Sequence, residues 1–229
     1  IKYDLTSQNM LRQFLCLAMM LALAAGHGRV VDPPGRSTMW RYGYPTAHNY
    51  DDNGLNCGGI QRQYGINSGR CGICGDAFDL PNPRPNEIGG LFGTGTIVAR
   101  YTQGQVITVV LELTAYHMGF FEFRICTDPL NNNQECFDQN LLELEEGGTK
   151  FYPWESATYT LKFRLPPGLV CDHCVLQWKY TCGHNWGTCS DGSQGIGCGD
   201  QETFWACSDI SIGGASRTDA VDAPVEPDM

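Results

Sequence analysis

The sequence predicts an all-β protein, an immunoglobulin- or fibronectin-like antiparallel β-sandwich that is disulfide-rich and carries long loops and short helices. Three observations support this fold class. Apolar and polar residues alternate in several short segments, turns rich in Gly, Pro and Asn separate them, and no segment keeps a helical period. Short strands with frequent turns are typical of two antiparallel sheets packed face to face.

The elements follow from this alternation. The predicted strands cover residues 106–114, 121–125, 159–165, 175–181 and 203–212. Residues 27–85 are rich in Gly, Pro, Asn and Asp, which predicts long loops with one short helix near 37–42. Long loops between strands are where functional groups tend to lie.

The first 26 residues have the layout of a secretory signal. A translation start at Met10 is followed by Arg12, an apolar run and small residues, with Ala24 and Gly26 placed for cleavage before His27. The apolar run is too short to span a bilayer, which needs about 20 residues. We therefore expect upstream residues and a signal peptide over 1–26, one folded domain over 27–212, a disordered tail or linker start over 213–229, and a secreted, extracellular protein.

The net charge of the chain limits the classes of partner that we expect it to bind. Cleavage removes two basic residues and one acidic residue, so the formal net charge changes from −10 to −11. A chain this acidic is repelled by nucleic acid and by anionic membranes, so neither is expected as a partner. A neutral polymer such as a polysaccharide imposes no such penalty.

Eleven of the 12 cysteines lie after residue 26. This density behind a signal peptide predicts disulfides in an oxidising compartment, with one thiol left over or paired with another chain. The two Cys-x-x-Cys pairs, 71–74 and 171–174, leave a zinc site as the alternative, although almost 100 residues separate them.

Two histidines have special settings. Cleavage would give His27 a free α-amino group beside its imidazole, a pair that can chelate a metal. His117 follows a strong strand in the segment Thr-Ala-Tyr-His-Met-Gly. For His48, His173 and His184 we expect structural or solvent-exposed roles.

These features resemble the lytic polysaccharide monooxygenases, and most closely the animal-type auxiliary-activity family fifteen. The similar stretches run in order along nearly the whole mature chain and cover 27–41, 56–59, 71–76, 115–117, 174–180 and 197–210. The resemblance implies one copper ion in a histidine brace, bound by the α-amine and Nδ1 of His27 and by Nε2 of His117. Nitrogen ligands of this kind suit Cu(II) independently of the resemblance.

The resemblance also implies roles around the copper. Phe204 matches an axial aromatic that cannot ligate, Ala115 a small residue on the opposite axial side, and Gln177 a polar residue just outside the ligands. Tyr116, Tyr42, Tyr44 and Tyr64 are candidates for a flat sugar-stacking face, with ordinary packing as the alternative for each.

The implied reaction is oxidative cleavage of β-1,4 links in crystalline chitin or cellulose. It would proceed by C1 or C4 hydroxylation with an external electron donor and O₂ or H₂O₂. A monomer is expected. The rival interpretations are a non-catalytic polysaccharide-binding protein and a copper carrier on the same fold.

Comparison with such relatives makes Cys182 the candidate free thiol. The remaining cysteines could then form five disulfides, with Cys126–Cys136 a plausible local pair. The pairing of the others is left open: Cys57, Cys71, Cys74, Cys171, Cys174, Cys189, Cys198 and Cys207.

Overall fold

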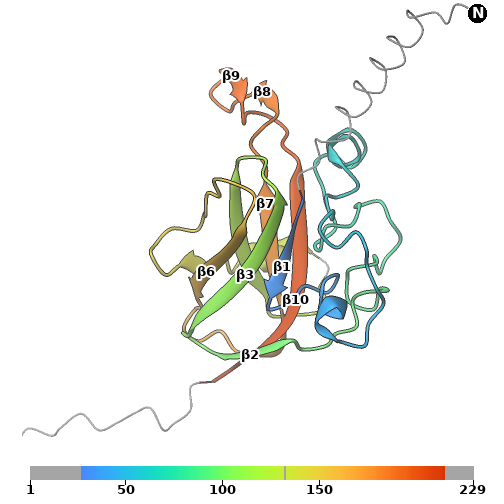
Figure 1. The fold of residues 1–229 in the computed structure, drawn as a ribbon, viewed down its shortest axis with the longest axis vertical. Helices are drawn as coiled ribbons and strands as arrows, with labels where there is room; N and C mark the ends of the chain where they lie inside the picture. The colour runs from blue at the N-terminus through green and yellow to red at the C-terminus, as the bar shows by residue number, and fades with distance from the viewer. Residues whose placement is uncertain (1–26, 132, 215–229) are drawn as a thin grey trace, which may run out of the picture.

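Two four-stranded sheets form the body of the molecule (Figure 1), seen in a computed structural model that describes residues 27–131 and 133–214. The first sheet has the order β1 (His27–Asp32), β3 (Val106–Ala115), β6 (Thr158–Arg164) and β5 (Glu143–Leu144). The second has the order β2 (Ala99–Thr102), β10 (Thr203–Gly213), β7 (Cys171–Thr181) and β4 (Phe120–Cys126). All pairings within them are antiparallel except that of β2 with β10. The predicted all-β sandwich is confirmed.

The core lies between the two sheets. Every second residue of β6 is buried, as are alternate residues along β3, so each strand presents one apolar side to the other sheet. Strand β10 differs, because all but its last residue are buried. It lies between the sandwich core on one side and a layer of loops on the other, which explains why its sequence lacks a clean alternation.

The helices are short. They are a 3₁₀ turn η1 (Met39–Tyr42), a π-helical segment η2 (Gln61–Ile66) and α2 (Gln134–Asp138). Helix η1 confirms the short helix expected near residues 37–42. The expectation of loops from residue 27 onward was wrong for β1, which is a short strand at the end of its sheet. Its six residues include Gly28 and end before Pro33, so they carry little strand signal by themselves.

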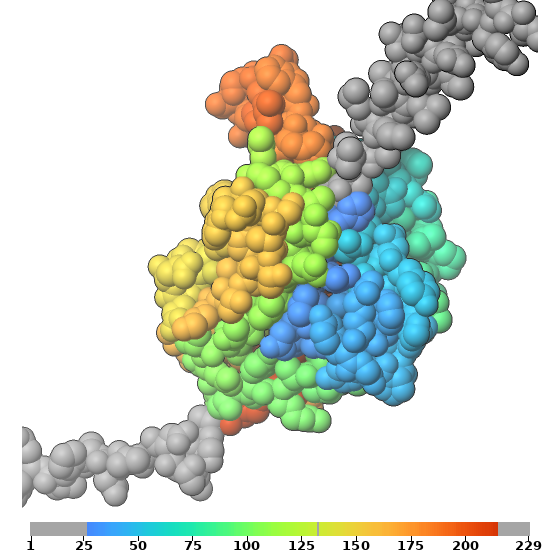
Figure 2. All heavy atoms as spheres, in the orientation of Figure 1, coloured from blue at the N-terminus to red at the C-terminus, as the bar shows by residue number. Residues whose placement is uncertain are grey.

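A small hairpin projects from one end of the sandwich. It consists of β8 (Trp186–Thr188) and β9 (Gln194–Ile196), and the Cys189–Cys198 disulfide joins its two arms. Figures 1 and 2 show it in orange, standing clear of the rest of the surface.

A buried ion pair fastens the first long loop to β10. The Arg36 guanidinium donates to both carboxylate oxygens of Asp209, at 2.7 and 2.6 Å, and to the carbonyl oxygen of Asn86 at 3.0 Å. His173 Nε2 lies 2.8 Å from the same carboxylate, which agrees with the structural role expected for this histidine. Charges this deeply buried need such partners, so the pair fixes the loop on the sheet.

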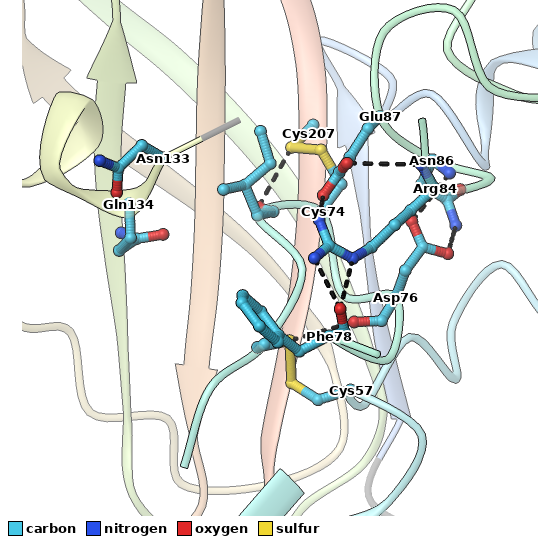
Figure 3. Close-up of polar contacts among 12 residues, drawn as sticks. Cys57, Cys74, Asp76, Phe78, Arg84, Asn86, Glu87, Asn133, Gln134 and Cys207 are labelled. Carbon is cyan, nitrogen blue, oxygen red and sulfur yellow. Dashed lines mark hydrogen bonds and ion pairs between the residues drawn. A yellow bond between two sulfur atoms is a disulfide. The ribbon is translucent and has the colours of Figure 1, made fainter. Parts of the chain in front are cut away.

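Figure 3 shows how the following loop is held. Arg84 donates to Glu87 Oε1 at 2.6 Å and to the carbonyl oxygen of Phe78, while Asn86 donates twice to Asp76 at 2.8 Å. Burial raises the pKa of the Asp76 carboxyl, and the hydrogen bonds from Asn86 oppose that shift. The loop therefore has an internal polar framework of its own.

The described part of the chain forms five disulfides: Cys57–Cys71, Cys74–Cys207, Cys126–Cys136, Cys171–Cys174 and Cys189–Cys198. Cys182 is the free cysteine of the described residues. The local Cys126–Cys136 pair and the unpaired Cys182 are thus as predicted. The zinc alternative fails, because the cysteines of both Cys-x-x-Cys pairs are oxidised.

The predicted signal peptide and most of the predicted tail lie outside the described residues. Within the part of the chain that is described, no helix is both long enough and apolar enough to cross a membrane.

Candidate metal centre

Pairing of β1 with β3 brings the two predicted histidine ligands to one end of the sandwich. His27 lies opposite Ala115 in this antiparallel register, and His117 follows two residues later, just beyond β3. The Thr114 hydroxyl donates to the His27 carbonyl oxygen at 3.1 Å and helps to hold the strand start in place. This is also the end from which the hairpin projects (Figure 1).

Two aromatic residues of the second sheet contact the two histidines. Phe204 is 1% exposed, and its ring centre lies 6.0 Å from that of His27. Tyr180 pairs with it across β7 and β10. The Tyr180 hydroxyl accepts from the His117 backbone N–H at 2.8 Å and donates to the Met118 carbonyl oxygen at 2.6 Å. This contact fixes the backbone of the loop that carries His117.

A third histidine and a thiol lie against His117. The rings of His117 and His184 meet edge to face, with centres 4.2 Å apart. Cys182, two residues before His184, is buried, and its sulfur lies within 4.8 Å of a ring nitrogen of each histidine. The Gly183 N–H donates to the His117 carbonyl oxygen at 2.9 Å, so the turn after β7 is joined directly to the loop after β3.

Glu202 places a carboxylate beside His117 at this end of the sandwich. Its Oε1 accepts from Asn56 at 2.9 Å, and its Oε2 lies 4.0 Å from His117 Nδ1. That separation is within range of an ion pair but too long for a hydrogen bond. Nδ1 of His117 and Nδ1 of His184 are both buried atoms without a hydrogen-bond partner.

Burial is the largest cause of the pKa shifts of His117 and Glu202. It lowers the pKa of His117, and the nearby charges of His184 and His27 lower it further. Burial raises the pKa of the Glu202 carboxyl, although the Asn56 hydrogen bond and the two histidines oppose that shift. A His117 that is neutral near pH 7 is in the state that metal binding requires.

Comparison with known proteins identifies the family. A family model described as lytic polysaccharide mono-oxygenase, cellulose-degrading, matches residues 27–210. The chain belongs to the lytic polysaccharide monooxygenases. One similar solved structure is the AA15 enzyme of Thermobia domestica in the Cu(I) state, with 50% identity, a TM-score of 0.79, and coverage of 82% of this chain and 99% of that one. Comparison with curated protein sequences gave no significant match.

Membership confirms the prediction of a copper-dependent monooxygenase that uses one copper ion. The donor set at this end fits that ion, because imidazole nitrogens suit copper, and His117 Nδ1, which lies 4.0 Å from the Glu202 carboxylate, leaves Nε2 of the same ring for a metal.

Gln177 is not brought to the histidines of this monooxygenase. It lies three residues from Tyr180 on β7, so its side chain points to the opposite face of the sheet. There its amide donates to the Ile73 carbonyl oxygen at 2.7 Å and pairs with Gln134. The expected polar role beside the copper is therefore wrong for Gln177, and Glu202 occupies a position that suits it.

The four tyrosines separate into two groups. Tyr116 adjoins His117, and Tyr64 on η2 donates to the Gln201 carbonyl oxygen at 3.0 Å and lines a cavity of about 450 Å³. Tyr42 on η1 is 49% exposed, and Tyr44 follows just after. Helix η1, in blue, lies toward the far end of β1 (Figure 1), so these two do not gather with the histidines.

Glu202 and His184 are the site residues that the sequence analysis missed. A signal for Glu202 existed, because it lies two residues before Phe204 and thus on the same side of the chain. His184 had no such signal, because only the turn after β7 places it against His117.

Proposed function

We propose that the mature chain begins at His27 and acts outside the cell as a monomeric enzyme that oxidises crystalline chitin or cellulose. The observation that carries this proposal is the pairing of His27 with Ala115, which puts the terminal residue beside His117. Cleavage before His27 would add the α-amine to the nitrogens already gathered there. Family membership supports the same conclusion.

The ligands in this proposal are the α-amine and Nδ1 of His27 and Nε2 of His117. An α-amine has a pKa near 8 (about 7.7–8.0), so copper displaces its proton at little cost. The lowered pKa of His117 keeps that ring neutral. Bound copper supplies one-electron chemistry with O₂ or H₂O₂ after reduction by an external donor.

The neighbouring residues shape the site. Phe204 has no donor atom, so beside His27 it would keep water from the metal without ligating it. The small side chain of Ala115, opposite His27, would leave room beside the metal. The Glu202 carboxylate, fixed by Asn56, is placed to accept or return a proton beside His117.

The hairpin is proposed as part of the polysaccharide-binding face. Trp186 is 68% exposed and pairs across the hairpin with Ile196, which is 61% exposed. Trp186 lies two residues after His184, so this apolar pair stands close to the histidines. An exposed tryptophan ring can stack on a sugar ring, and a projecting hairpin can rest on a crystalline surface that cannot enter a cleft.

Product analysis tests the function. The mature protein is incubated with copper, ascorbate and either chitin or cellulose, and soluble oligosaccharides are examined by mass spectrometry. We expect oxidised oligosaccharides from at least one polymer, with their masses and fragments distinguishing C1 from C4 oxidation. Binding without oxidised products indicates a non-catalytic binding protein, and tight copper binding without products on either polymer indicates a copper carrier.

A further inference from the structure

The cavity of about 450 Å³ that Tyr64 lines lies on the outer face of the second sheet. Lys179 of β7 and Trp205 of β10 line it as direct cross-strand partners. Each lies between two core residues of its strand, so both side chains point away from the sandwich core. Gln134 of α2 lies to one side and Phe78 to the other (Figure 3). Small-molecule sites have roughly this size, about 300–1,000 Å³.

The cavity is cationic, although the chain as a whole is acidic. Among the described residues that line it, Lys179 and Arg70 are cationic and none carries a carboxylate. The formal net charge of the sequence, by contrast, is −10. Arg70 is exposed, and its guanidinium lies 4.3 Å from the centre of the Phe78 ring. A cavity with this local sign favours an anionic ligand.

The Lys179 ammonium has no counter-ion in contact with it. The described residues give it neither an ion pair nor a hydrogen bond, and it lies 4.8 Å from the centre of the Trp205 ring. The carboxylates of Glu122 and Asp138 each pair with Arg124 instead, at 3.1 Å. Burial lowers the pKa of Lys179, and the charge of Arg124 lowers it further, while the two carboxylates oppose that shift. A desolvated ammonium of this kind gains much from a negatively charged ligand.

The glutamines that line the cavity already have partners. Gln63 accepts from the Thr203 hydroxyl at 3.1 Å and donates to the Gly69 carbonyl oxygen at 3.2 Å. Gln134 and Gln177 exchange hydrogen bonds between their amides at 3.0 and 2.9 Å. These amides are therefore less available to a ligand than the two cations are.

We infer that this cavity binds a small aromatic carboxylate, with the carboxylate on Lys179 and the ring against the apolar wall. Ile73, Phe78 and Trp205 provide that wall. An ammonium and a carboxylate form a strong charge-assisted hydrogen bond, and an aromatic ring adds apolar burial and ring contacts. Arg70, at an exposed position, adds a second positive charge.

Benzoate is the probe, because it carries only a ring and a carboxylate and does not reduce copper. Calorimetric titration of the copper-loaded mature protein should show one benzoate bound per chain. Benzamide has the same shape without the charge and should bind more than about tenfold more weakly. The electron paramagnetic resonance spectrum of the copper should stay the same. The proposed copper ligands do not line the cavity, so failure of the copper proposal would leave this result unaffected.

Three variants define the site. Lys179→Met should weaken benzoate binding by more than about tenfold, and Arg70→Met should weaken it less. Lys162→Met is the matched control, because Lys162 lies on β6 of the other sheet and pairs with Glu145 at 3.3 Å, and it should change nothing. Melting curves verify folding, and Arg70→Met decides the question if Lys179→Met does not fold.

Four results would overturn the inference. They are no benzoate binding at millimolar concentration, equal affinity for benzamide, unchanged benzoate affinity in Lys179→Met, and a copper spectrum that changes with benzoate in both the unsubstituted protein and Lys179→Met. The last result would place the carboxylate on the metal rather than in the cavity.

Discussion

Two regions of this monooxygenase differ in how their buried titratable side chains are paired. In the loop layer over β10, Arg36 is paired with Asp209, and Arg84 with Glu87, at 2.6 Å in each case. At the histidine end, Nδ1 of His117 and Nδ1 of His184 have no hydrogen-bond partner. In the first region the buried charged side chains are paired with one another, whereas in the second the buried imidazoles gather without such partners. Stability and function are thus separated along the molecule.

Breaking the ion pair of the loop layer should have the largest effect on stability. Arg36→Met leaves the Asp209 carboxylate buried without its main partner, which should lower the free energy of unfolding by about 3–5 kcal/mol. Denaturant unfolding of the mature protein measures this. Copper affinity should be unchanged at temperatures where the variant is folded.

The matched control is Arg62→Met. Arg62 and Asp79 form an ion pair whose side chains are 37% and 39% exposed, so its loss should destabilise the fold far less than Arg36→Met does. Equal destabilisation by the two substitutions would show that the buried pair has no special role.

Removing a copper ligand should weaken copper binding strongly and destabilise the fold only a little. His117→Ala should lower copper affinity by more than about 100-fold, since loss of even an outer partner of a ligand costs 10–100-fold. It should destabilise the fold less than Arg36→Met does, because Nδ1 of the ring makes no hydrogen bond. Calorimetric copper titration and melting curves measure the two effects separately. Unchanged copper affinity would remove His117 from the site.

Removing the Cys126–Cys136 disulfide should have an intermediate effect on the free energy of unfolding. The double variant Cys126→Ser and Cys136→Ser opens a short loop and should cost about 2–3 kcal/mol on chain-entropy grounds. Cys182→Ser, at the histidine end, should be tolerated. Thiol titration of the unfolded, unreduced mature protein should find one thiol per chain, on the peptide that contains Cys182. A second reactive thiol would contradict the disulfide assignment.

Phe204→Tyr should have the smallest effect. An axial phenol is a weak and distant donor, so copper should stay bound and its electron paramagnetic resonance spectrum should shift only modestly. Phe163→Tyr places the same hydroxyl in the core, where the side chain is 1% exposed, and should lower the melting temperature without changing the spectrum. If the spectrum changes equally in both variants, Phe204 is not the residue beside the copper.

The sequence predicted those parts that depend on local patterns. Alternation predicted the strong strands, and the odd cysteine count predicted one unpaired thiol. The family resemblance pointed to Cys182 as that thiol and to Phe204 as a neighbour of His27. Gln177 was misjudged because a position on the right strand does not give the right face, and a shift of one residue reverses it. His184 could not be found, since its place against His117 depends on the turn between β7 and the hairpin.

The most direct test of the central claim is the dependence of copper binding on a free His27 amine. Two mature proteins are compared by calorimetry, one beginning at His27 and one with a single glycine before it. The account predicts tight binding of one copper ion by the first and a loss of more than about 100-fold in affinity in the second, with equal melting temperatures before copper is added. Equal copper affinity in the two proteins would contradict it.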